Sequence, residues 1–284
     1  MKAPEQVFAD LMRRTPFQPA TNLWRAVELD AVQQHGLPSG RGLDLGCGDG
    51  KLSAIVMDML GSDALAATQW TGVDIDPAET AQAQACGLYE KVHTGSAADI
   101  PEADGSFDFV FSNSVLEHIG PIDEVLQEAA RLLRPGGRFI CTVPGPDFHA
   151  CLSGPSLGRL SRADYLREVD TRCAHLRYWS EGEWRQHLGA VGLQVQTAWP
   201  YLSQRQTQRW ESLSAWTGGL AYRLYGRAPR PIEIQRKWGL RSSETSLSGR
   251  LGAAATSLLA AGCPLSSKDR SKSHGCLLID AVKS

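Results

Sequence analysis

Long hydrophobic runs are missing from this sequence. It has no run of about 20 apolar residues, which is the length that a membrane-spanning helix needs. The opening stretch MKAPEQVFADLMRRTPF also lacks the short apolar core of a secretory signal peptide. These absences argue against a spanning helix and against export, and we therefore expect a cytoplasmic protein.

Paired cysteines are missing as well. The seven cysteines are an odd number, are scattered along the chain and include no C-x-x-C pair, the usual spacing of zinc-binding or redox-active thiols. Cys173 and His175 are close in sequence, but no second pair of ligands accompanies them. We therefore expect reduced, mostly buried thiols and no metal site.

Neither sign of charge dominates the whole chain, whose formal net charge is −2. The two parts of the chain nevertheless differ. Residues 1–199 contain 16 Lys and Arg against 26 Asp and Glu, a charge of −10, whereas residues 200–284 contain 13 against 5, a charge of +8. This asymmetry indicates that the two parts have different roles.

From residue 41 to residue 146, short apolar runs alternate with amphipathic segments. Five such repeats imply a parallel sheet, because consecutive parallel strands need a crossover helix between them. Two more strands are expected, one after Gly192 and one in the final stretch HGCLLIDAVKS. We therefore expect an α/β fold with a doubly wound, mostly parallel, Rossmann-like sheet of seven strands and helical cover insertions. The first five expected strands are 42–48, 70–77, 89–97, 107–114 and 138–144, and the expected helices between them include 51–60, 78–85 and 122–134, the last stopped by Pro135.

This sheet leaves two long segments outside it. The N-terminal segment is predicted to be a helical cover, with a helix capped near Thr21 or Asn22. The segment before the final strand is predicted to be a helical insertion rich in basic and aromatic residues, since a connection of that length rarely lacks structure. The predicted domains are the N-terminal cover 1–38, the core 39–199, the insertion 200–273 and the final core strand 274–284.

The stretch GLDLGCGDGK contains the end of the first expected strand, at the edge of the sheet where such folds bind ligands. Its glycines, Gly46, Gly48 and Gly50, are spaced G-x-G-x-G. A dinucleotide-binding loop has the pattern G-x-G-x-x-G/A, and its last position is occupied here by Lys51. A plain tight turn and the NAD-binding loop of an oxidoreductase are the weaker alternatives, and the pattern favours a different nucleotide-like ligand.

Asp44 precedes the loop by two residues, and the combination resembles the first motif of class I S-adenosylmethionine-dependent methyltransferases. The stretch TGSAADIPEADGSFDFV is similar to the third and fourth motifs of that family, and SNSVLEHI and LLRPGGRFICTVP are similar to the segments that follow. Within the family, the sequence looks like the small-molecule type found in ubiquinone and menaquinone biosynthesis. The resemblance covers residues 41–146 well and residues 200–273 hardly at all.

The resemblance implies an enzyme that binds S-adenosylmethionine, with the glycine loop around the methionine moiety and Asp44 on the side of its ammonium group. Asp74 would accept hydrogen bonds from both ribose hydroxyls, and Ile75 would lie against the adenine. Ser96, which replaces the usual aspartate, and the Ala97 amide would read the adenine edge. The alternatives are a helix cap for Asp74 and a plain loop hydroxyl for Ser96. The residues predicted to bind the cofactor are Asp44, Gly46, Gly48, Gly50, Asp74, Ile75, Ser96, Ala97 and Asn113.

A methyl group on a sulfonium is already activated, so the protein mainly has to align the reactants and exclude water. An acidic acceptor group also benefits from a nearby base. His118, with Glu117 beside it at the exit of the fourth strand, is the predicted catalytic pair, and the alternative is a packing or capping histidine. His149, His175 and Tyr178 are further candidates for lining the acceptor pocket.

Arginine and tryptophan are interleaved in residues 200–241, a composition that suits nucleic acid, an anionic small molecule, a peripheral membrane contact or a solvated helix face. Base-amine methyltransferases carry a (D/N/S)-P-P-(Y/F/W) box after the fourth strand, and this chain has SNSVLE there, which disfavours nucleic acid. Residues 251–265 are apolar and too short to span a bilayer. We therefore expect a small amphiphilic or apolar methyl acceptor, such as a lipid-like, quinone-like or secondary-metabolite molecule. RNA modification and a non-catalytic, cofactor-binding scaffold are the alternatives.

Overall fold

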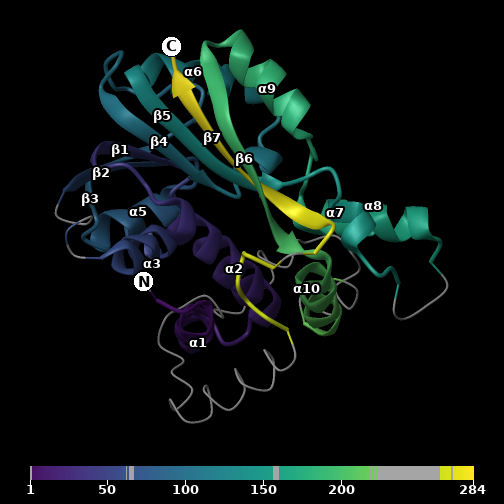
Figure 1. The fold of residues 1–284 in the computed structure, drawn as a ribbon. Coiled ribbons are helices and arrows are strands. Elements are labelled where there is room, and N and C mark those ends of the chain that lie inside the picture. The colour runs from purple at the N-terminus through teal and green to yellow at the C-terminus, as the bar shows by residue number, and fades with distance from the viewer. Residues whose placement is uncertain are drawn as a thin grey trace.

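The computed structural model describes residues 2–61, 63, 67–155, 160–217, 219, 222, 263–269 and 271–284. Their strands are β1 (Gly40–Leu45), β2 (Thr68–Asp74), β3 (Tyr89–Thr94), β4 (Phe107–Asn113), β5 (Leu133–Pro144), β6 (Leu193–Ser203) and β7 (His274–Lys283). These strands form one sheet in the order β3-β2-β1-β4-β5-β7-β6 (Figure 1). β7 is antiparallel to β5 and β6, and the other pairs are parallel. The predicted doubly wound, mostly parallel, seven-stranded sheet is confirmed.

The strands are largely apolar because helices cover both faces of the sheet. Successive residues of a strand point to opposite faces, so Phe109 and Phe111 of β4 pack on one face and Val110 on the other. The first face packs against α1 (Pro4–Arg14), α2 (Pro19–His35), α3 (Lys51–Leu60) and α5 (Pro77–Ala85), and the second against α6 (Ile122–Leu132) and α9 (Glu181–Ala190).

The ends of the helices follow local capping rules in some places and tertiary contacts in others. Ser180 caps α9, with Glu183 closing a reciprocal capping box. The predicted cap of the N-terminal helix near Thr21 or Asn22 is wrong, because α2 already begins at Pro19, a residue suited to the first helical turn. α6 ends at Leu132, two residues before its predicted end, where the chain becomes extended and joins β5.

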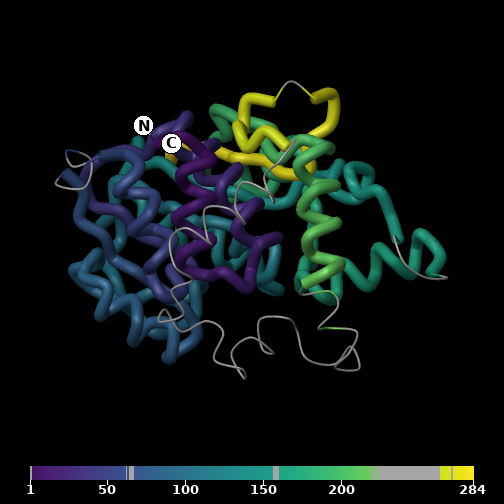
Figure 2. The backbone as a smooth tube through the Cα atoms, turned by 90° about the horizontal axis from the view of Figure 1, so that it is seen from below, coloured from purple at the N-terminus to yellow at the C-terminus, as the bar shows by residue number. Residues whose placement is uncertain are grey.

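Segments from distant parts of the chain meet at the carboxyl ends of the strands. The 3-10 turn η1 (Leu116–His118), α7 (Phe148–Cys151) and α8 (Arg162–Cys173) lie there, together with α10 (Gln204–Trp216). α2 and α10 are in contact, although the whole core separates them in sequence (Figures 1 and 2). This arrangement places the N-terminal helices over the edge of the sheet where ligands of such folds bind.

The boundary between the core and the basic insertion differs from the prediction. β6 continues to Ser203, four residues beyond the predicted end of the core, because its pairing with β7 continues to His274. α10 follows directly and agrees with the expected helical character of this segment. Residues 223–262, which contain most of the predicted basic and apolar insertion, lie outside the described residues.

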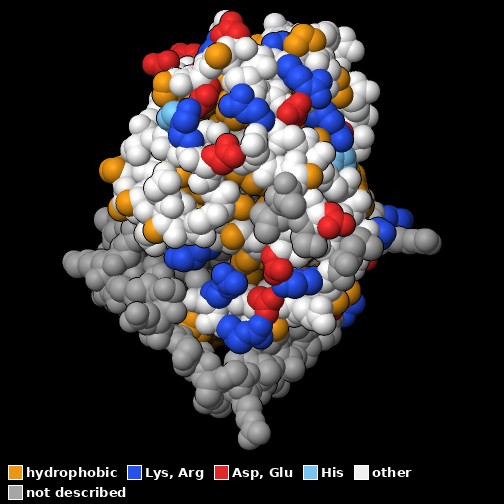
Figure 3. Space-filling view, turned by 90° about the vertical axis from the view of Figure 1, so that its left-hand side faces the viewer, with side chains coloured by type: hydrophobic (Ala, Val, Ile, Leu, Met, Phe, Trp, Pro, Cys, Tyr) orange, Lys and Arg blue, Asp and Glu red, His pale blue; other side chains and the backbone are white. Residues whose placement is uncertain are grey.

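The side of the molecule that Figure 3 shows carries lysine and arginine intermixed with aspartate and glutamate. Such mixed charge is typical of an ordinary solvated surface. Within the described ranges, none of the helices combines the length and the apolar character that crossing a membrane requires.

Candidate functional site

The loop between β1 and α3 turns sharply at its glycines. Gly46, Gly48 and Gly50 have φ angles of 83°, 52° and 75°, a region that residues with a side chain rarely adopt. A Cβ atom at Gly46 would lie 2.5 Å from the Val115 side chain. A Cβ atom at Gly48 would meet nothing within 4 Å, so the backbone of Gly48 borders open space that a ligand can enter.

Asp44 lies buried beneath this loop, with 2% of its surface exposed. Its Oδ2 accepts hydrogen bonds from Ser53 Oγ of α3 and from Tyr89 Oη of β3, both at 2.5 Å. Burial raises the pKa of Asp44 to about 6, although the two hydroxyls oppose this shift. The Asp44 carboxylate therefore braces α3 and β3 against the loop. Its predicted position beside the ammonium group of the ligand stays a prediction.

Asp74 ends β2 next to the glycine loop. Its Oδ2 accepts a hydrogen bond from the Gly48 amide and its Oδ1 from the Asp76 amide, each at 2.9 Å. Each carboxylate oxygen has a further lone pair, so Asp74 can still accept hydrogen bonds from two hydroxyl groups. The neighbouring Ile75 has 76% of its surface exposed. Spare acceptors at Asp74, an exposed apolar side chain and the open space at Gly48 together fit a ligand with a ribose and an aromatic base.

Ser96 and Ala97 lie in the loop that follows β3. Ser96 Oγ accepts a hydrogen bond from the Ala98 amide at 3.1 Å, so this hydroxyl stabilises the loop itself. Ala97 is partly buried against the core on the α6 face of the sheet. The predicted contacts of Ser96 and Ala97 with adenine stay predictions.

Asn113 ends β4 and connects three elements. Its Oδ1 accepts a hydrogen bond from Arg25 of α2 at 2.8 Å, and its Nδ2 donates one to Thr142 Oγ1 of β5 at 2.7 Å. Both ends of the Asn113 amide are therefore engaged by the protein. Its predicted contact with the cofactor stays a prediction.

Two charged residues of α2 lie at this edge of the sheet, and neither was predicted from the sequence to be part of the site. Arg25 donates a hydrogen bond of 2.5 Å to Glu28, whose side chain is completely buried. Glu28 Oε1 also accepts hydrogen bonds from Ser114 Oγ at 2.5 Å and from Tyr201 Oη at 2.9 Å. The sequence did contain a signal for these two residues, since they are a basic and an acidic residue three positions apart in a mostly apolar helix. Charged side chains are seldom buried without a partner of opposite charge.

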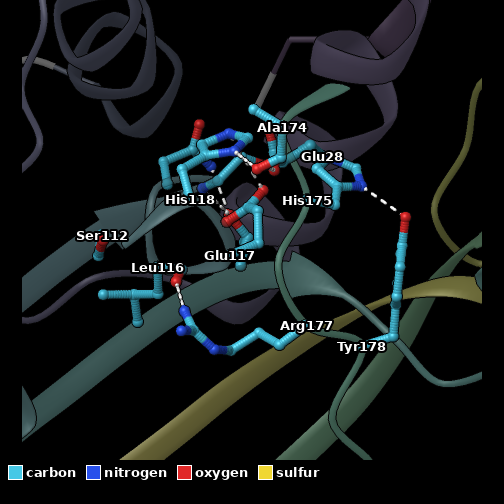
Figure 4. A network of polar contacts seen from close by, with 12 residues as sticks. Glu28, Ser112, Leu116, Glu117, His118, Ala174, His175, Arg177 and Tyr178 are labelled. Atoms are coloured by element: carbon cyan, nitrogen blue, oxygen red, sulfur yellow. Dashed lines mark hydrogen bonds and ion pairs between the residues drawn. The ribbon is translucent and has the colours of Figure 1, made fainter. Parts of the chain in front are cut away.

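The turn η1 after β4 carries Glu117 and His118 (Figure 4). Glu117 is 1% exposed, and its Oε2 has no hydrogen-bond partner among the described residues. Burial raises the pKa of Glu117 to about 8. His118 Nδ1 lies 2.9 Å from the Ala174 carbonyl, which can only accept, so Nδ1 carries the proton. His118 Nε2 lies 3.9 Å from Glu117 Oε1, so the predicted catalytic pair is close in space as well as in sequence.

His175 reaches the same point from the segment after α8. The rings of His118 and His175 are 5.5 Å apart between their centroids. His175 Nδ1 lies 3.0 Å from Tyr178 Oη, and Tyr178 donates a hydrogen bond of 2.5 Å to Asp170, which His149 also contacts at 2.7 Å. Burial lowers the pKa of His175 to about 3, so its ring is neutral. The structure therefore joins the three further acceptor-pocket candidates in one network with the predicted catalytic pair.

Aromatic rings pack around His175. Phe148 of α7 stacks on Tyr178 with 5.5 Å between the ring centroids, and it also contacts Trp24 of α2 and Trp210 of α10. The rings of Phe148 and Trp24 lie 5.7 Å and 6.3 Å from the His175 ring. The polar cluster of Glu117, His118 and His175 therefore has an apolar wall that four separate segments build.

Comparison with known proteins finds methyltransferases that are similar to part of this chain. Residues 43–141 match a family model described as a methyltransferase domain. A demethylmenaquinone methyltransferase of Symbiobacterium thermophilum is 33% identical over 116 residues, which are 39% of this chain and 45% of that protein. A ubiquinone biosynthesis O-methyltransferase of Xanthomonas oryzae pv. oryzae is 36% identical over 124 residues, which are 41% of this chain and 49% of that protein. The chain thus spans just under half the length of these curated relatives.

The fold agrees with this family match. A SAM-dependent methyltransferase from Thermotoga maritima superimposes with a TM-score of 0.54 over 98% of this chain and 99% of that chain, at 15% sequence identity. At so low an identity, the likeness shows the fold alone. It extends over elements outside residues 43–141.

Proposed function

Because residues 43–141 form a class I S-adenosylmethionine-dependent methyltransferase domain, an enzyme domain whose cofactor is S-adenosylmethionine, we propose that the whole protein methylates a small amphiphilic or apolar molecule. One observation carries this proposal. The glycine loop, Asp74 and the Glu117–His118 pair lie at or beyond the ends of β1, β2 and β4, which are neighbouring parallel strands. A methyl donor and a methyl acceptor can therefore meet at one edge of the sheet.

At the cofactor end, we assign the contacts mainly to the backbone and to Asp74. The Asp74 carboxylate accepts hydrogen bonds from the ribose hydroxyls, Ile75 packs against the adenine, and the backbone at Gly48 lets the methionine moiety approach closely. Ser96 and the Ala97 amide border the adenine edge. When bound there, S-adenosylmethionine supplies a methyl group on a positively charged sulfur. Asp44 acts by holding the loop in place, as its internal hydrogen bonds suggest.

At the acceptor end, we assign contact with the substrate to His118 and Glu117. The Nδ1 proton of His118 is engaged by the Ala174 carbonyl, which leaves a lone pair on Nε2. That lone pair can take a proton from the acceptor, or hold the acceptor group while it aligns with the methyl carbon. Oε2 of Glu117, which has no hydrogen-bond partner among the described residues, offers a second polar contact beside it.

The character of the acceptor follows from the aromatic wall around His175. Trp24, Phe148, Tyr178 and Trp210 form a largely buried aromatic cluster next to a few polar atoms at this end of the site. Such a combination suits a ring-bearing, amphiphilic molecule. The names of the two relatives, a ubiquinone biosynthesis O-methyltransferase and a demethylmenaquinone methyltransferase, agree with a quinone-like acceptor. A cytoplasmic location is part of this proposal.

Isothermal titration calorimetry with the full chain tests the cofactor end. S-adenosylmethionine should bind and NAD should not. Asp74→Ala should weaken the binding of S-adenosylmethionine by more than about tenfold, because two hydrogen bonds to a charged group are lost. Glu124→Ala removes a carboxylate from the exposed side of α6 and is the matched control. Binding of NAD alone, or unchanged affinity in Asp74→Ala, contradicts the assignment.

Turnover tests the acceptor end. Formation of S-adenosylhomocysteine is followed with quinol-like and lipid-like acceptors and, in parallel, with RNA. His118→Ala should lower kcat/KM by about 10²- to 10⁴-fold with the true acceptor if His118 takes its proton. Methylation of RNA, with binding that weakens steeply as salt rises, would replace the small-molecule acceptor with nucleic acid. Cofactor binding without turnover on any acceptor would instead indicate a non-catalytic scaffold.

A further inference from the structure

Three side chains able to bind a metal converge where η1 meets the segment after α8. Glu117, His118 and His175 each offer one oxygen or nitrogen atom, and these atoms lie within 4.8 Å of one another (Figure 4). Glu117 and His118 are adjacent in sequence, whereas His175 follows 57 residues after His118. The tertiary structure therefore assembles two imidazoles and one carboxylate, a ligand set that divalent transition metals use in sites with open coordination positions.

The hydrogen bonds of both histidines place the ring proton on Nδ1 in each case. His118 Nδ1 donates to the Ala174 carbonyl, so its Nε2 keeps a lone pair. Tyr178 has one hydroxyl proton and donates it to Asp170, so the Tyr178 oxygen accepts a hydrogen bond from His175 Nδ1. Nε2 of His175 thus also keeps a lone pair. A histidine whose other nitrogen donates to a fixed acceptor is the usual state of a metal ligand.

The surroundings of Glu117 are a second, independent observation that fits a bound cation. Its side chain is 1% exposed, and its buried Oε2 has no hydrogen-bond partner among the residues that the structure describes. Buried carboxylate oxygens are normally bonded to a donor or a cation. The neighbouring His118 side chain is 39% exposed, so the cluster opens to solvent on that side and a cation can enter there.

We propose that Glu117, His118 and His175 bind one divalent transition-metal cation, such as Zn²⁺. The bonds in such sites are about 2.0–2.2 Å long, so the ligand atoms move closer together by roughly one ångström when the cation binds. The half-exposed His118 has room for this movement. Three protein ligands leave at least one coordination position for the acceptor.

The cation also specifies the acceptor, and this part of the inference rests on the proposed function. With the cation bound, His118 Nε2 is a ligand and does not take the proton of the acceptor. A hydroxyl oxygen bound to the cation instead gives its proton to water more readily, because the positive charge stabilises the resulting oxyanion. That oxygen forms the new bond to the methyl carbon while the carbon–sulfur bond breaks and its electron pair stays on sulfur. The acceptor is then a molecule with a ring hydroxyl, or two adjacent hydroxyls, and it is methylated on oxygen.

The experiment measures metal binding directly on the full chain. Chelator-treated protein is titrated with Co²⁺ while its visible absorption is recorded, and Zn²⁺ is then added. One Co²⁺ should bind per chain, and Zn²⁺ should displace it. His118→Ala and Glu117→Gln should each weaken Co²⁺ binding by at least about tenfold. His187→Ala removes a histidine of α9 that pairs with Asp123, and it should bind Co²⁺ as the wild type does.

Two results would overturn the metal site: wild-type protein that binds no Co²⁺, or His118→Ala and Glu117→Gln proteins that bind it as tightly as the wild type. Circular dichroism checks that each variant folds. If the buried Glu117→Gln change prevents folding, His118→Ala at its partly exposed position decides the question.

Calorimetry with S-adenosylmethionine on the metal-free protein separates the two proposals. Cofactor binding without Co²⁺ binding removes the metal site and leaves the methyltransferase proposal standing. Co²⁺ binding without cofactor binding removes the methyltransferase proposal and supports the metal site.

Discussion

The cofactor end of the candidate site comes from a few residues between Asp44 and Ala97 that lie at or beyond the ends of β1, β2 and β3. Most of its contacts involve backbone groups. For example, the Gly48 amide donates a hydrogen bond to Asp74. The acceptor end combines α2, the turn after β4, the segment after α8 and the end of β6. Its contacts run through buried charged and aromatic side chains.

The difference shows two ways of building a binding surface. A tight turn at the cofactor end fixes the positions of backbone atoms through local geometry, so its requirements are for glycine and a short spacing. The acceptor end buries the carboxylates of Glu28 and Glu117, whose cost depends on the partners that distant segments supply. We therefore expect the acceptor end to be the more sensitive to the loss of one charged side chain.

The largest effect is expected from Arg25→Ala. This change leaves Glu28 buried without its opposite charge, and it should lower the free energy of unfolding by about 4 kcal/mol. Arg167→Ala breaks an exposed pair with Asp164 and should cost about 0.5 kcal/mol or less. Urea unfolding followed by circular dichroism measures both. Equal losses in the two variants would remove the contrast between the buried and the exposed ion pair.

The next largest effect separates two glycines of the same loop. Gly46→Ala combines a positive φ with a Cβ atom 2.5 Å from Val115, and should cost about 3 kcal/mol of folding stability. Gly48→Ala meets no atom within 4 Å and should cost about 1 kcal/mol. Its larger effect should be on S-adenosylmethionine binding, measured by calorimetry. A Gly48→Ala protein with normal cofactor affinity would show that the open space at Gly48 is not where the ligand lies.

A smaller effect is expected from pH. Burial raises the pKa of Asp44 from 3.8 to about 6, so the folded state binds the Asp44 proton more tightly than the unfolded state does. The resulting contribution to the free energy of unfolding is full below about pH 4 and is lost as the pH rises through 6. Asp44→Asn has no such titration. The wild type should therefore lose about 2 kcal/mol relative to Asp44→Asn between pH 4 and pH 7. Parallel pH curves of unfolding free energy for the two proteins would show that Asp44 is not strained by burial.

The smallest effect is expected from Tyr178→Phe. The change removes the hydroxyl that links His175 to Asp170, at a cost of about 1 kcal/mol in unfolding free energy. It also frees His175 Nδ1 from its acceptor, so Co²⁺ affinity should fall by about tenfold even though Tyr178 is not a metal ligand. Tyr222→Phe is the matched control and should change neither value by as much. Unchanged Co²⁺ affinity in Tyr178→Phe would show that this hydrogen bond does not orient His175.

The central strands of the sheet were predictable because burial on both faces gives strands such as β4 a nearly continuous apolar run. The ends of the helices were less predictable. Asn22 has the side chain of a typical cap, yet it lies inside α2 and donates to the Thr15 carbonyl. A side chain that suits a cap can equally well bond a neighbouring turn, and the packing of α1 against α2 decides between these uses.

The sequence by itself determined the α/β fold and located the glycine loop on which the proposed cofactor site depends, since apolar periodicity and the spacing of Asp44 and the glycines are local properties of the chain. Only the tertiary structure brought His175 to Glu117 and His118, and Glu28 of α2 to Ser114. No local pattern marks residues that are distant in sequence as neighbours in space. Whether a carboxylate is buried, and which group compensates its charge, depends on how the covers pack on the sheet.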